Sequence, residues 1–225
     1  MPIPVTNQGF KQGNFSGYTT HGRCEVVDKL TFQSPFHPRS IEIKPVGGGR
    51  FFAVLDPNND ATVDGNGARK RAISGLEAPA DTTAYNFQDD FTGMMTFGID
   101  GAILEINNVS IKHNQALHFR WQFLGYDTID GGLNDFALFD ACHGVHANPA
   151  NPCYRKVLAH ALDLSGTGYT GWNNWIWQPD RDFTGVLRWV VSNGVMDNQP
   201  PASITSSMTA RPSSLLIDII KIETV

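Results

Sequence analysis

The sequence predicts an all-β fold, a two-sheet antiparallel jelly-roll sandwich with long loops. Helical periodicity is almost absent, because no long stretch repeats apolar residues at i, i+3 and i+4 spacing. Short apolar segments bounded by Gly, Pro, Asn and Asp recur instead, which is typical of sandwiches and barrels. We expect one jelly-roll domain over residues 1–225, because the sequence shows no internal repeat and no Pro/Ser linker.

The clearest predicted strand covers residues 116–124. Four large apolar residues alternate there with three polar ones: Leu117, Phe119, Trp121 and Phe123 against His118, Arg120 and Gln122. A period of two with one apolar face predicts a half-buried antiparallel strand.

Further strands are predicted at other short apolar segments. These are 51–55, 102–106, 109–111 and 186–191. The segment 214–222 is almost continuously apolar, which suits a strand deep in the sandwich.

Turn-rich stretches separate the strands at 56–67, 125–134, 143–152, 165–174 and 193–209. They are long for simple hairpin loops. Because long loops on a rigid sandwich commonly carry binding surfaces, we expect the ligand to be recognised there.

Charge and hydropathy exclude several partners. The net charge is −5, and the only short basic run is Arg69-Lys70-Arg71, whereas a phosphate-tracking surface needs concentrated positive charge. We therefore expect no nucleic-acid partner. No apolar run reaches membrane-spanning length, so no membrane insertion is expected. Residues 1–9 lack the basic and apolar regions of a signal peptide.

The chain has three cysteines, Cys24, Cys142 and Cys153. Cys142 and Cys153 bracket the turn-rich stretch 143–152, and two states are open. A disulfide can clasp this loop, stabilising the fold by roughly 2–3 kcal/mol in the loop-entropy model, or both thiols can be reduced.

Three segments resemble one family. They are 9–22 (GFKQGNFSGYTTHG), 119–127 (FRWQFLGYD) followed by 134–139 (NDFALF), and 214–222 (SLLIDIIKI). In this order they resemble the bacterial jelly-roll modules of surface adhesins and exported proteins, whose architecture is similar to galactose-binding-like carbohydrate-binding modules.

The resemblance implies a binding module and a calcium ion. In related jelly rolls a calcium ties the N-terminal segment to the last strand, which makes Asn14 and Asp218 its implied ligands. The sequence departs from the family pattern at Tyr18 and Ile219, where Trp and Asn are usual, and in an insert with two Cys after Phe139.

Oxygen-rich loops are the residue-level reason to expect calcium, which takes six to eight oxygen ligands. Asp56, Asn58 and Asp60 begin like an EF-hand loop, although the later positions do not match. The alternative is a polar loop of Asx turns. Asn134 and Asp135 are further candidate ligands, and the alternative for this pair is bonding to backbone groups alone.

Asp218 lies within the last apolar segment. A near-buried carboxylate should be paired or metal-bound. Strand alternation places Leu216, Asp218 and Ile220 on one face of this strand and Leu215, Ile217 and Ile219 on the other.

An aromatic cluster is the candidate recognition surface. Tyr169, Trp172, Trp175 and Trp177 lie close together in the sequence, and Asp127 is the candidate polar contact in another loop. Exposed rings stack on sugar faces or grip peptide side chains. The alternative is that the tryptophans line the core under a long loop.

These observations predict a non-catalytic module, because neither a G-x-S-x-G elbow nor a phosphate-cradling loop occurs. We expect an extracellular or cell-surface protein that is stabilised by calcium and recognises glycan or peptide through its loops. The alternative is a structural component of a particle, such as a virion-surface decoration or fibre protein, which packs against symmetry-related copies.

Overall fold

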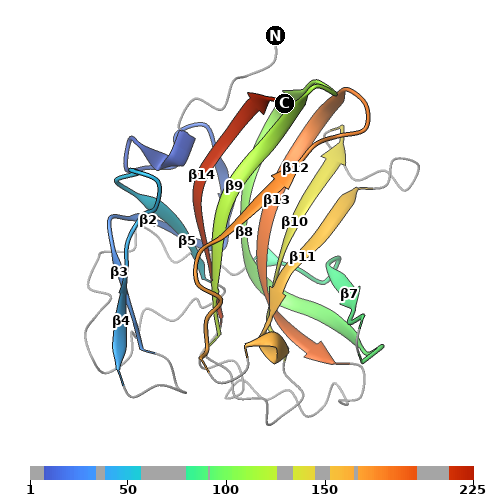
Figure 1. Ribbon diagram of the computed structural model, residues 1–225. Helices are drawn as coiled ribbons and strands as arrows, with labels where there is room; N and C mark the ends of the chain where they lie inside the picture. The colour runs from blue at the N-terminus through green and yellow to red at the C-terminus, as the bar shows by residue number, and fades with distance from the viewer. Residues whose placement is uncertain are drawn as a thin grey trace.

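The computed structural model describes residues 8–33, 39–56, 80–90, 92–125, 134–144, 153–164, 167–196 and 213–225. They form two antiparallel sheets packed face to face and a separate two-stranded hairpin (Figure 1). The predicted all-β jelly-roll sandwich is therefore confirmed. The helical pieces in these residues are two short 3-10 turns, η1 (Gln8–Phe10) and η2 (Ala161–Asp163). Neither has the length or apolar character to cross a membrane.

One sheet has seven strands, of which five run in the order β1-β8-β13-β10-β11. Their bounds are β1 (Thr19–His21), β8 (Met95–Ile111), β13 (Phe183–Met196), β10 (Phe136–His143) and β11 (Tyr154–His160). Two short strands also pair with β8, β6 (Ala80–Asp81) and β7 (Asn86–Gln88).

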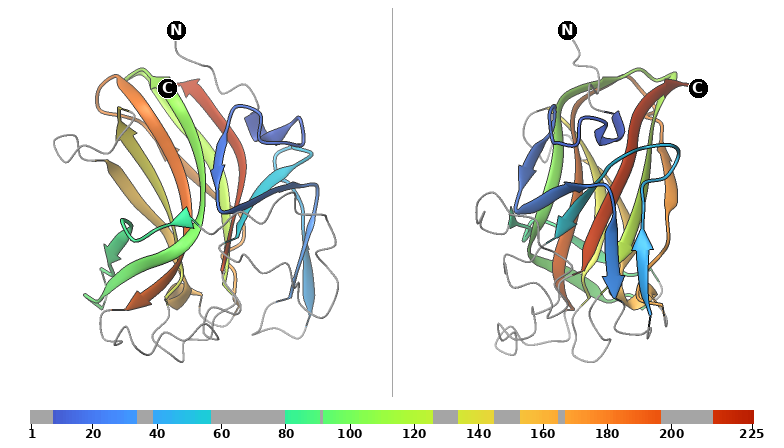
Figure 2. Two further views of the ribbon diagram at one scale, coloured as in Figure 1. Left: turned by 180° about the vertical axis from the view of Figure 1, so that it is seen from behind. Right: turned by 90° about the vertical axis from the view of Figure 1, so that its left-hand side faces the viewer.

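The other sheet has five strands in the order β12-β9-β14-β5-β2. Their bounds are β12 (Asn173–Trp177), β9 (Gln115–Leu124), β14 (Ser214–Thr224), β5 (Phe52–Asp56) and β2 (Arg23–Val27). The hairpin of β3 (Leu30–Gln33) and β4 (Ser40–Ile43) lies beside this sheet (Figure 2, right). Phe32 and Ile43 of the hairpin pack on Phe52, Val54 and Leu216, so it covers part of the outer face.

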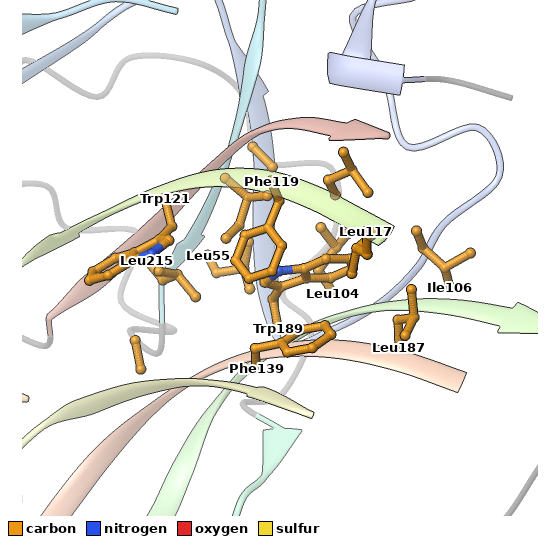
Figure 3. Packing of buried hydrophobic residues seen from close by; sticks show 14 of the residues in the cluster. Leu55, Leu104, Ile106, Leu117, Phe119, Trp121, Phe139, Leu187, Trp189 and Leu215 are labelled. Atoms are coloured by element: carbon orange, nitrogen blue, oxygen red, sulfur yellow. The ribbon is translucent and has the colours of Figure 1, made fainter. Parts of the chain in front are cut away.

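The main core lies between the two sheets, whose side chains point toward each other (Figure 3). Trp189 of β13 is fully buried and contacts Phe119 of β9 and Phe139 of β10, with ring centroids 5.4 and 5.5 Å away. The apolar residues predicted to alternate along 116–124 all belong to this core, which confirms the half-buried strand.

Segments 102–106 and 109–111, predicted as separate strands, are parts of the single long strand β8. Ile106 is opposite Leu187 and Val109 is opposite Gly185, so Asn107 and Asn108 together face one residue of β13. This is a β-bulge. Asn108 has a φ of 56°, a left-handed conformation that asparagine tolerates better than most residues.

A second bulge corrects the predicted faces of the last strand. Asp218 is opposite Arg120 and Lys221 is opposite His118, so Ile219 and Ile220 together face Phe119. The extra residue reverses the alternation. Ile220, expected on the face of Asp218, is buried in the main core instead. Ile219 has a φ of 49°, which is a strained conformation for a β-branched side chain.

Cys142 and Cys153 form a disulfide with an S–S distance of 2.05 Å, so the structure has the first of the two predicted states. It joins the end of β10 to the residue before β11. Cys24 forms no disulfide within the described part of the chain.

A row of alternating charges crosses the seven-stranded sheet. Glu105 is opposite Arg188, Arg188 is opposite Asp140, and Asp140 is opposite Arg155. Arg188 donates Nε–H to Glu105 Oε2 at 2.6 Å, and Arg155 donates Nε–H to Asp140 Oδ1 at 3.2 Å. Burial raises the pKa of the Asp140 carboxyl, and the charges of Arg155 and Arg188 oppose this shift.

Candidate functional site

The outer face of the five-stranded sheet carries a hollow of about 800 Å³, which we call the basin. It lies where β9, β12 and β14 continue beyond the part of the face covered by the β3–β4 hairpin. Its described lining residues are Gly9, Lys11, Gly47, Gly48, Gly49, Arg50, His118, Phe119, Arg120, Asn174, Trp175, Ile176, Ile219 and Lys221.

Strand pairing sets the positions of the side chains on the basin floor. Arg120 of β9 is opposite Asn174 of β12, and His118 of β9 is opposite both Ile176 of β12 and Lys221 of β14. Because alternate residues of β9 point into the main core, His118 and Arg120 point outward. Ile176 is 59% exposed, which leaves one apolar side chain open beside these polar groups.

Asp218 lies beside the basin floor and holds its wall in place. The side chain is fully buried. Its Oδ2 accepts the backbone N–H of Val46 at 2.8 Å, and its Oδ1 accepts that of Ile219 at 2.7 Å. One carboxylate therefore fixes both the loop before β5 and the bulge of β14. Burial raises the pKa of Asp218, and these two N–H donors and the charge of Arg120 oppose the shift.

The loop between β4 and β5 forms one wall, and it can approach β14 closely because it contains glycine at the points of contact. Gly47 has a φ of 67°, and an added Cβ there would lie only 2.5 Å from Ile219 Cδ1. At Gly49 an added Cβ would lie 3.3 Å from Asp218 Oδ1. Gly47 and Gly49 therefore allow this turn to lie against β14.

The partner of Asp218 differs from the one implied by the family resemblance. The N–H donors come from Val46 and Ile219, not from the segment around Asn14. Asn14 is exposed, and its Oδ1 accepts the N–H of Ser16 at 2.9 Å. The reason is the close approach of the glycine loop, which brings its own N–H groups to the carboxylate.

Asn134 and Asp135 are buried and bond mainly to backbone. The two carboxylate oxygens of Asp135 accept the N–H groups of Gly194 at 3.1 Å and Ser213 at 2.9 Å. Asn134 Oδ1 accepts the N–H of Leu162 at 3.3 Å, and its Nδ2 donates to Thr96 Oγ1 at 2.9 Å. The pair therefore bonds three backbone N–H groups and one side-chain hydroxyl.

The structure does not bring Asp135 and Asp218 together. Asp135 accepts the backbone N–H of Ser213. Ser213 precedes Asp218 by five residues, which is roughly 16 Å along a strand. Within the described ranges, the one group of three His, Cys, Asp or Glu side chains with mutually close ligand atoms is Asp140, Cys142 and Cys153, whose sulfurs form the disulfide. Asp56 ends β5 and is 3% exposed. Asn58, Asp60 and Asp127 lie outside the described residues.

The four predicted aromatic residues do not form one exposed platform. Trp177 is 8% exposed and packs in the main core against Phe139, Tyr154 and Phe183. Trp172 packs on Phe52 and donates its indole N–H to the Lys44 carbonyl at 3.2 Å.

Tyr169 packs on Phe32, with ring centroids 6.1 Å apart. Trp175 lines the basin, but it is half-buried and packs against the main core. Trp175 and Trp177 of β12 therefore pack against the main core, whereas Trp172 and Tyr169 pack against the apolar cluster under the β3–β4 hairpin.

Sequence reasoning missed the polar residues that line the basin. A signal existed for His118 and Arg120, because a polar residue on a half-buried strand marks its outer face. No comparable signal existed for Asn174 or Lys221, since they become neighbours of β9 only through strand pairing.

No family model and no curated protein matches this chain. Among solved structures, the chain is similar to TmCBM61 in complex with β-1,4-galactotriose, at 13% identity, with 100% of each chain covered and a TM-score of 0.39. It is also similar to the CBM22-2 xylan-binding domain from Paenibacillus barcinonensis Xyn10C, at 11% identity, with 97% of this chain and 98% of that chain covered and a TM-score of 0.37. The CBM22-1 domain of the same protein matches at 8% identity over 97% and 92%, with a TM-score of 0.38.

Proposed function

We propose that this chain is a non-catalytic carbohydrate-binding module, extracellular or on a cell surface, and that the basin is its ligand site. The observation that carries the proposal is the basin itself. Its volume of about 800 Å³ is within the range of small-ligand sites, about 300–1,000 Å³. It is open along the outer face of a sheet, which suits part of a longer chain as well as a small molecule.

The chemistry of the lining suits sugars. A sugar hydroxyl both donates and accepts hydrogen bonds, so its ideal partners are planar groups with fixed donors and acceptors. Arg120 supplies donors, while Asn174 and His118 supply both kinds of atom. The exposed Ile176 offers an apolar contact for the C–H face of a sugar ring.

The same lining supports binding without catalysis. Glycoside hydrolysis ordinarily uses a pair of carboxylates that flank the scissile bond. None of the described residues that line the basin is Asp or Glu. The nearby carboxylate of Asp218 is buried and accepts two backbone N–H groups, which gives it a structural role.

Glycan arrays and titration of the hits test the proposal. We expect Asn174→Ala to weaken glycan binding about fivefold, because a neutral hydrogen bond contributes about 1 kcal/mol. Lys29→Ala is the matched control, since Lys29 is exposed and does not line the basin. Binding that is unaffected by Asn174→Ala would place the ligand elsewhere. An absence of glycan hits, together with peptide hits or with obligate oligomers or filaments, would favour a peptide ligand or a particle component.

We propose, separately, a calcium site in the loop that begins at Asp56. Chelator is expected to lower the melting temperature, because an ion that binds only the folded state stabilises it by about 2.7 kcal/mol at a hundredfold excess over Kd. The double variant Asn58→Ala/Asp60→Ala should abolish the chelator effect, and Asp135→Ala should retain it. A melting temperature that is insensitive to chelator, or a sensitivity that survives in the double variant, contradicts this site.

A further inference from the structure

Positive charge is concentrated in the basin. The chain has a net charge of −5, with 17 Lys and Arg against 22 Asp and Glu. Four of these cations, Lys11, Arg50, Arg120 and Lys221, line the basin, and none of the acidic residues is among its described lining. A concave surface of one sign beside a low-dielectric wall focuses its field on a ligand.

Arg120 is the central cation. It is half-buried on the middle of the floor, between Asn174 on one side and Asp218 on the other. In the described part of the chain its guanidinium forms no ion pair, and Asp218 acts on it only through its charge. The carboxylate of Asp218 accepts two backbone N–H groups, and no carboxylate of a described residue is bound to the planar fork of Arg120.

The other cations surround this position. Lys11 and Arg50 are exposed residues of the lining, from the N-terminal segment and the glycine loop. Lys221 pairs with Glu223 at 2.7 Å, and Glu223 also lies 3.9 Å from His118. Since this pair is solvent-exposed, Glu223 offsets Lys221 only weakly. The charge available to a ligand is that of Arg120, Lys11 and Arg50, together with the weakly offset charge of Lys221.

We propose that the basin selects acidic glycans, in which Arg120 binds a carboxylate or sulfate group of a sugar bidentately while Lys11 and Arg50 attract the neighbouring charges. This rests on the proposed function and names the ligand class of the same site. Arginine suits this role because its fork matches the oxygen pair of a carboxylate or sulfate.

A glycan fits better than a nucleic acid. Single-stranded nucleic acids are bound by aromatic rings on which the bases stack, together with a cationic track along the backbone. The exposed large apolar residue on the basin floor is Ile176, whereas the nearby Trp175 packs against the core. The cations that line the basin also lie together in one hollow, whereas the chain as a whole is acidic.

The test compares acidic polymers with neutral forms of the same linkage. Polygalacturonate and its carboxyl-reduced form are titrated in parallel, as are chondroitin sulfate and its desulfated form. The first pair tests carboxylate, and the second pair tests sulfate. We expect the acidic member of at least one pair to bind about tenfold more tightly, with a preference that decreases as salt is raised.

Variants separate the basin from the rest of the surface. Arg120→Gln should reduce the acidic-to-neutral affinity ratio to about one. The double variant Lys11→Gln/Arg50→Gln changes only exposed side chains and should lower this ratio several-fold. It tests the inference if Arg120→Gln does not fold. Lys29→Gln is the control and should keep the ratio of the unsubstituted protein.

Three outcomes overturn the inference. Equal affinity for both members of each pair, with binding still weakened by Asn174→Ala, contradicts acidic selectivity and leaves the proposed function standing. Binding of single-stranded DNA as tight as that of the acidic glycan shows a general polyanion surface. Binding of neither member of either pair, together with an array free of hits, contradicts the inference and the proposed function together.

Discussion

An Arg188→Met variant is expected to lose about 4 kcal/mol of its free energy of unfolding, because removing one partner of a buried ionic network typically costs about 3–5 kcal/mol. Arg188 lies between Glu105 and Asp140 on neighbouring strands. The Asp140 side chain is 2% exposed and that of Glu105 is 13% exposed. Without Arg188, Glu105 loses its 2.6 Å hydrogen bond, and Arg155 is the one cation of the charge row that still pairs with Asp140.

The loss in free energy of unfolding caused by Arg188→Met should depend on pH. Burial already raises the pKa of Asp140 above its ordinary value of 3.8, and loss of Arg188 removes one of the charges that oppose this rise. Between 3.8 and the raised pKa the folded state binds more protons than the unfolded state, so stability decreases as pH rises through that window. The difference between Arg188→Met and the unsubstituted protein is therefore expected to be smaller at low pH than at pH 7.

Denaturant unfolding at several pH values measures both effects. For a chain of this length, about 4 kcal/mol corresponds to roughly 8–16 °C in melting temperature. Arg181→Met is the control, because Arg181 is exposed and lies outside the charge row. A loss below 1 kcal/mol, or a deficit that grows as pH falls, would show that the row is not a coupled buried network.

Asp218→Ala is expected to lower the free energy of unfolding by about 3 kcal/mol, or roughly 6–12 °C in melting temperature. The substitution leaves the N–H groups of Val46 and Ile219 without their acceptor in a buried site. It also releases the glycine loop and the bulge that frame the basin. Glycan binding should weaken only as far as this part of the fold loosens.

Asp218→Asn provides a matched comparison, since its single carbonyl oxygen can serve one N–H group while its NH₂ group faces the other. We expect a loss between those of the unsubstituted protein and Asp218→Ala. Thermal melts and glycan titrations are made on the same samples. If Asp218→Ala melts like the unsubstituted protein but no longer binds, Asp218 contacts the ligand and is not a positioning residue.

The sequence by itself determined the fold class and the places of several strands. The alternation from Leu117 to Phe123 requires one buried face, and the structure buries that face. The apolar run at 214–222 becomes β14, which lies between β9 and β5. These features depend on local periodicity, which a sequence displays directly.

The bulges were decided by tertiary structure. The run Ile217-Asp218-Ile219-Ile220 shows no local sign that two isoleucines will face one residue of β9. The left-handed conformation of Ile219 is strained, and it persists because Asp218 and the packed core hold both of its ends. Without this bulge, Ile219 would not face the basin.

The basin could not be predicted from the sequence either. It combines the segments 9–11, 47–50, 118–120, 174–176 and 219–221. They meet through strand register, which is a long-range property of the sheet. Along β12 the more buried Trp175 and Trp177 alternate with the exposed Asn174 and Ile176. Only the packing of the second sheet decided which face is buried, because the tryptophan face of β12 meets the core and leaves Asn174 and Ile176 in the lining of the basin.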